Sequence, residues 1–81
     1  MTTKFRHTPT TSGSAAIRSA LSASGIKARV ATQPYAYRVV SDDHRAMAAL
    51  VALGLEGPTG GEPVRSGLNS FFAYDFAGLG A

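Results

Sequence analysis

The sequence contains no cysteine and no tryptophan, and only five of its 81 residues are acidic. Without cysteine, the chain can form neither a disulfide framework nor a thiolate zinc site. A chain of this length buries only about 60 to 65% of the surface that its unfolded form exposes. The core must therefore stabilise the fold alone or with a partner, and homo-oligomerisation stays open.

Long apolar runs are also missing. No stretch approaches the roughly 18 uninterrupted apolar residues of a membrane-spanning helix, and the first residues, MTTKFRHTPTTSGS, lack the apolar segment of a signal peptide. The sequence therefore predicts a cytoplasmic protein with no membrane partner. A hydrophobic content of 44% with 16% charged residues is typical of a globular chain, and we expect a single domain over residues 1–81 with frayed residues 1–13.

Signatures of catalysis are absent as well. There is no Gly-x-Ser-x-Gly motif, and the glycine-rich EGPTGGEP lacks the Gly-Lys-Ser/Thr ending of a phosphate-binding loop. Asp42, Asp43 and His44 are neighbours that could in principle bind a metal, but carboxylates in the first turn of a helix are more often caps. We therefore expect no enzyme, no cofactor and no metal site.

Positive charge is concentrated in one half of the chain. Residues 1–40 have no acid, whereas residues 41–81 contain all five acids and only two basic residues. Such asymmetry indicates an acidic partner, either nucleic acid or an acidic protein surface, unless the two halves neutralise each other in the fold. The basic residues of the first half are Lys4, Arg6, Arg18, Lys27, Arg29 and Arg38.

The pattern of residues predicts the element order β-α-β-β-α-β. Strands are expected at residues 3–8, on both sides of Pro34 within residues 25–40, and at 70–76; helices are expected at 15–24 and from residue 41 or 42 onward. Residues 56–69 contain four glycines and two prolines, which predict a mobile loop without a regular element. The fold class is α+β, a mixed or antiparallel sheet with two helices on one face.

The hairpin around Pro34 decides which side chains face solvent. A loop with an even number of residues, either Gln33-Pro34 or residues 32–35, places the apolar residues of both strands on one face. Proline favours the longer of these two loops. In that register Arg29 lies directly opposite Arg38, while Tyr35 and Tyr37 face the helices. The arginines would splay into water or hold an anion between them. That anion is either the Asp75 carboxylate or an acidic group of a partner.

The last expected strand alternates between two sets of side chains. Phe71, Ala73 and Asp75 lie on one face, and the opposite set is Phe72, Tyr74 and Phe76. Placing Asp75 on the open side makes Phe71 the best exposed aromatic. We therefore expect the partner-binding residues to be Lys27, Arg29, Arg38, Arg6 and Phe71.

The profile of the whole chain, a small single domain without catalytic motifs, resembles that of proteins encoded by phages and mobile elements, among them the anti-CRISPR proteins. The resemblance implies non-catalytic inhibition of a host CRISPR-Cas complex by protein–protein occlusion, in the host cytoplasm. Many anti-CRISPR proteins are acidic mimics of nucleic acid, whereas this chain is basic. The alternatives are a nucleic-acid-binding module that uses the face of Lys27, Arg29 and Arg38, or a structural subunit of a phage particle.

Overall fold

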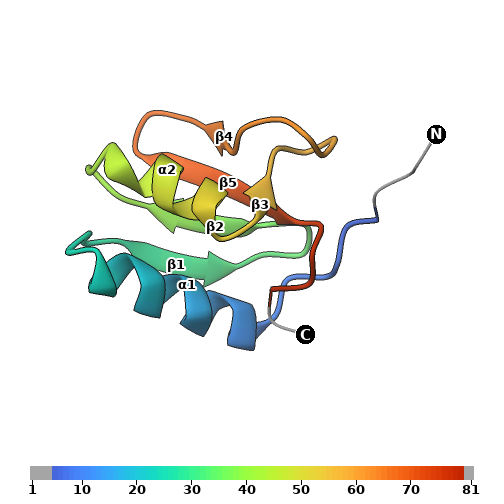
Figure 1. The fold of residues 1–81 in the computed structure, drawn as a ribbon, viewed down its shortest axis with the longest axis horizontal. Helices are drawn as coiled ribbons and strands as arrows, with labels where there is room; N and C mark the ends of the chain where they lie inside the picture. The colour runs from blue at the N-terminus through green and yellow to red at the C-terminus, as the bar shows by residue number, and fades with distance from the viewer. Residues whose placement is uncertain (1–4, 80–81) are drawn as a thin grey trace.

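The structure, a computed structural model, describes residues 5–79 and has the α+β class that the sequence predicts (Figure 1). Two helices accompany an antiparallel sheet of five strands, in which β5 pairs with β2 on one side and with both β3 and β4 on the other. The elements in chain order are α1 (Thr11–Ala23), β1 (Arg29–Thr32), β2 (Tyr37–Val40), α2 (Arg45–Ala52), β3 (Leu55–Glu56), β4 (Arg65–Ser66) and β5 (Ser70–Asp75).

Two parts of the expected element order are wrong. Residues 5–8 form no strand, and the rest of the expected first strand lies outside the described residues. One backbone hydrogen bond still ties this segment to the sheet, because the His7 N–H donates to the Asp75 carbonyl at 2.6 Å. The glycine-rich segment 56–69 does contain a regular element, β4, which pairs with β5. The mobility of that segment stays a prediction.

Helix α1 is fixed at both ends by local hydrogen bonds. The Thr10 hydroxyl accepts a hydrogen bond from the Gly13 N–H at 3.0 Å, which is the usual arrangement of a helix N-cap. At the other end Gly25 has a φ of 72°, and the Ile26 N–H donates to the Leu21 carbonyl at 2.9 Å. This ending directs the chain into β1 and brings Ile26 into the core.

Both helices pack against one face of the sheet. In Figure 1, α1 runs alongside β1 and α2 crosses in front of the sheet. The apolar side chains of the two helices meet those of the central strands in a single core. Its main members are Ile17, Leu21, Ile26, Tyr37, Val39, Ala46, Leu50, Leu55, Val64, Phe71 and Ala73. Neither helix covers the opposite face of the sheet, and none in the described part is long and apolar enough to cross a bilayer.

The loop between β1 and β2 has an even number of residues, as expected, but the register is shifted by two residues. The loop spans residues 33–36, since the Gln33 N–H donates to the Ala36 carbonyl at 3.0 Å. Arg29 therefore pairs with Val40, and Arg38 pairs with Ala31, so the two arginines are diagonal neighbours rather than directly opposite. The shift also leaves Tyr35 in the loop with 74% of its surface exposed, whereas we expect it in the core from the sequence.

Candidate functional site

A row of side chains crosses the uncovered face of the sheet. Arg38 on β2 pairs with Phe72 on β5, and Phe72 pairs on its other side with Arg65 on β4. Directly paired residues of antiparallel strands project from the same face, with Cβ atoms about 4.5 to 5.5 Å apart. The Phe72 ring therefore lies between two arginines that come from different strands.

A second aromatic ring with an arginine lies two residues further along β5. Tyr74 projects from the same face as Phe72 because side chains alternate along a strand. The Arg6 guanidinium lies over the Tyr74 ring, 5.3 Å from its centroid, which is within the range of a cation–π contact. We call the surface formed by Arg6, Arg29, Arg38, Arg65, Phe72 and Tyr74 the arginine face.

The cations of the arginine face are available to an external anion. Arg29, Arg38 and Arg65 are exposed, and none of them forms a salt bridge within residues 5–79. Lys27 lies next to Arg29, and the two line a hollow of about 500 Å³ at the end of the face. The structure therefore places Arg6, Arg29 and Arg38 on the uncovered side of the sheet, and Lys27 lines the hollow at its end. That these residues bind a partner stays a prediction.

The prediction for Phe71 is wrong. Phe71 pairs with Val39 and is only 8% exposed, so it belongs to the core. Asp75 is likewise 2% exposed, and it is not the carboxylate that lies between the arginines. A buried carboxylate is tolerated here because its oxygens accept hydrogen bonds from the Gly78 and Leu79 N–H groups, at 2.7 to 3.0 Å.

The partner-binding set predicted from the sequence also leaves out three residues of the arginine face, Arg65, Phe72 and Tyr74. If Asp75 must face solvent, the alternation along the strand places Phe72 and Tyr74 in the core. In the structure the turn after β5 instead donates hydrogen bonds to the Asp75 carboxylate, so Asp75 can be buried. The signal was the glycine three residues after Asp75, because aspartate often accepts hydrogen bonds from the backbone of a following turn. Arg65 belongs to a strand of two residues, which is too short to show a period.

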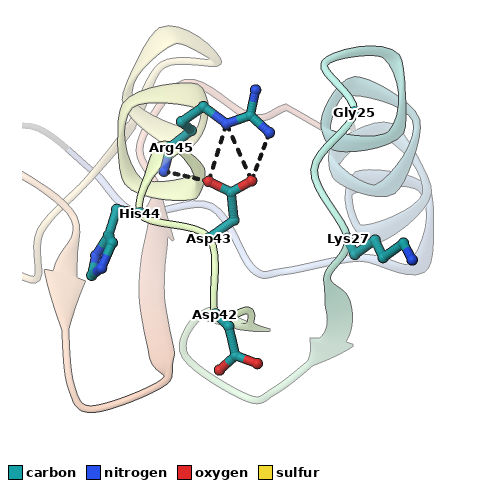
Figure 2. A pocket seen from close by; sticks show the side chains of 6 residues that line it. All are labelled: Gly25, Lys27, Asp42, Asp43, His44 and Arg45. Carbon is teal, nitrogen blue, oxygen red and sulfur yellow. Dashed lines mark hydrogen bonds and ion pairs between the residues drawn. The ribbon is translucent and has the colours of Figure 1, made fainter.

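A larger pocket, of about 730 Å³, opens between the end of α1 and the start of α2 (Figure 2). Within this pocket Asp43 accepts hydrogen bonds from the Arg45 guanidinium at 2.7 to 3.1 Å and from the Arg45 N–H at 2.9 Å. These bonds, the side-chain ones first, lower the pKa of Asp43 from its usual 3.8 to about 2. Asp43 is therefore a carboxylate bound to its neighbour at neutral pH.

The other polar groups of this pocket do not converge on a common point. Figure 2 shows Lys27, Asp42 and His44 pointing in different directions, away from the pair of Asp43 and Arg45. Over the described residues 5–79, no three His, Cys, Asp or Glu side chains are grouped as metal ligands would be. The pocket offers no arrangement of acid, base and nucleophile, so the arginine face is the stronger candidate site.

Comparison with protein-family models, curated proteins and solved structures gave no match for this chain.

Proposed function

We propose that this is a non-enzymatic binding protein that holds single-stranded nucleic acid on the arginine face. The observation behind the proposal is the position of Phe72 between Arg38 and Arg65. An aromatic ring can stack on a base, and arginines beside it can bind the phosphates on either side. Tyr74 beneath Arg6 repeats the combination along the same strand.

A single strand fits this surface better than a duplex does. The rings of Phe72 and Tyr74 can stack only on bases that are not already stacked within a duplex. Such bases occur in single strands, loops and ends. Both helices pack against the other face of the sheet, so neither is presented on the arginine face for insertion into a major groove. We therefore expect single strands to bind more tightly than duplexes of the same sequence.

Fluorescence anisotropy with labelled DNA and RNA strands of about twelve nucleotides tests the proposal, since one small domain covers a site of this order. We expect Arg38→Glu to weaken binding at least about tenfold, because it replaces a phosphate-binding group by a repelling one. The matched control is Arg18→Glu, which changes the net charge equally but lies on α1, outside the arginine face. Equal losses in the two variants would show a general charge effect and would refute the proposed site.

The aromatic part of the site needs its own comparison. Phe72→Leu keeps an apolar side chain but removes the ring, and we expect it to weaken binding roughly 5- to 100-fold, which corresponds to the loss of one stacked base. Phe72→Tyr keeps the ring and should bind nearly as the parent does. If Leu and Tyr at this position behave alike, base stacking on Phe72 is excluded.

Inhibition of a CRISPR-Cas complex by occlusion is a second proposal for the same surface. Arginine and tyrosine are enriched among the residues that dominate protein interfaces, and Leu68, 98% exposed in the β4–β5 turn, offers an apolar anchor beside it. Purified effector complexes, treated with nuclease to remove free strands, should retain the parent protein on a sizing column and lose it with Arg38→Glu. Either partner fits a cytoplasmic location, which stays a prediction.

A further inference from the structure

A hollow of about 410 Å³ lies on the arginine face where β4 pairs with β5. Its lining is Arg65, Ser66, Gly67, Phe72 and Tyr74. We infer that this hollow, here called the base hollow, selects guanine from a bound single strand, an inference that rests on the proposed function. The volume is in the range of sites that hold small ligands.

The two rings make the hollow suited to a flat apolar ligand. Phe72 and Tyr74 are each partly buried, so packing holds them in place while part of each side chain stays open to solvent. Their Cα atoms are two residues apart on one strand, a separation of about 6.8 Å. A base that enters the hollow can therefore stack on one ring and touch the other at its edge.

Arg65 is the group that distinguishes one base from another. It is exposed, it lies directly opposite Phe72, and no acid pairs with it within residues 5–79. Its guanidinium presents a planar fork of donors, and guanine is the base that offers two neighbouring acceptors, O6 and N7, to such a fork. Adenine and cytosine place an amino donor on the same edge, which would face the N–H groups of Arg65.

Gly67 keeps the hollow open. Its φ is not positive, and a Cβ added there would meet no heavy atom closer than the Ser70 carbonyl oxygen at 3.9 Å. A larger side chain at this position can thus be accommodated without backbone strain and would extend into the space that a base needs. Gly67→Leu is therefore a blocking variant that leaves Arg65 in place.

The test compares thymine strands of about twelve nucleotides that carry one central guanine, adenine or cytosine, or none, by anisotropy. We expect the strand with guanine to bind the parent roughly 5- to 100-fold more tightly than the others. Arg65→Lys keeps the charge but not the fork, so the ratio between guanine and thymine strands should fall to about one. The control Arg18→Lys should keep the ratio of the parent.

The variants also separate failure of this inference from failure of the proposed function. If the parent binds all the strands equally, or Arg65→Lys keeps the preference, the base hollow does not select guanine, although the arginine face still binds single strands. If no strand binds, the proposed function fails and the inference fails with it. Gly67→Leu, checked for folding by circular dichroism, should lose the preference as Arg65→Lys does; a retained preference would place the guanine elsewhere and overturn the inference.

Discussion

At the scale of single residues, the pair of Asp43 and Arg45 shows how a surface group acquires an altered ionisation. The pKa of Asp43 falls to about 2 because the Arg45 side chain and backbone N–H both donate to its carboxylate. A carboxyl group with a lowered pKa stabilises the fold at pH values above its unfolded pKa, and this contribution is lost as the pH falls through the folded pKa. For Asp43 the loss occurs between about pH 4 and pH 2.

We predict that Arg45→Met moves the titration midpoint of Asp43 from about 2 most of the way back towards 3.8. The side-chain donor disappears, while the backbone N–H remains. Carbon-13 NMR of the Asp43 carboxyl group measures the midpoint directly. Arg18→Met, which removes an arginine elsewhere, should leave it unchanged, and a midpoint near 2 in both variants would contradict the assigned cause.

Gly13 illustrates a second kind of constraint on a single residue, close approach. A Cβ at this position would overlap the Tyr37 hydroxyl oxygen, and Tyr37 is fully buried with its hydroxyl accepting a hydrogen bond from the Thr10 N–H at 3.0 Å. We predict that Gly13→Ala lowers the free energy of unfolding by about 1 to 3 kcal/mol through overpacking, although alanine favours a helix by itself. Urea denaturation measures the change.

The control for Gly13→Ala is Gly67→Ala, which adds the same methyl group where the nearest heavy atom is 3.9 Å away. Gly67→Ala should stay within about 0.5 kcal/mol of the parent. If the two variants have the same stability, the Tyr37 side chain moves to accommodate the added methyl group, and its contact does not require glycine at position 13.

At the scale of elements, the sequence predicts long periodic segments and fails for short ones. The apolar face of α2, with Ala46 and Leu50 buried, follows from helical spacing. β3 and β4 have two residues each, so no period can identify them, and both depend on β5 for their partners. The face of β5 that enters the core could not be predicted either. Asp75 is buried because the following turn donates hydrogen bonds to it, and a pattern of apolar residues contains no information about such a turn.

We therefore expect the hydrogen bonds of the Asp75 carboxylate to hold the turn after β5 against the end of the strand. We predict that Asp75→Ala lowers the free energy of unfolding by about 1 to 3 kcal/mol, because the partly buried N–H groups of Gly78 and Leu79 lose their acceptor. Hydrogen exchange at these two amides should accelerate more than exchange elsewhere. Asp42→Ala, at an exposed position, is the control and should change stability little; equal effects of both variants would contradict a special role for Asp75.

At the scale of the whole molecule, the exposed arginines Arg29, Arg38 and Arg65 form no salt bridge with an acid within residues 5–79. Within residues 5–79, Asp43 binds Arg45, Glu62 accepts a hydrogen bond from the Thr59 N–H, and Asp75 lies in the core. Glu56 pairs with Tyr74 and so lies beside the arginine face, where its carboxylate accepts a hydrogen bond from the Gly61 N–H. Three of the four arginines of the first half, Arg6, Arg29 and Arg38, instead lie with Arg65 on the face that the helices leave open. The basic half of the sequence thus supplies most of the cations on the uncovered face of the sheet.

This distribution makes a quantitative prediction for the salt dependence of binding. Each phosphate contact with a single strand contributes about −0.7 to the slope of log K against log salt concentration, so three or four arginine–phosphate contacts give a slope of about −2 to −3. The affinity should then fall roughly 20- to 50-fold between about 50 and 200 mM salt.

Variants of the arginine face show which residues make those contacts. Arg29→Gln and Arg38→Gln should each reduce the magnitude of the slope by about 0.7, and Arg18→Gln should leave it unchanged. A slope that is steep in the parent but insensitive to both face variants would mean that the phosphates lie elsewhere. The slope depends on the number of phosphate contacts, whereas the affinity also includes base stacking. Phe72→Leu should therefore lower the affinity at every salt concentration without changing the slope.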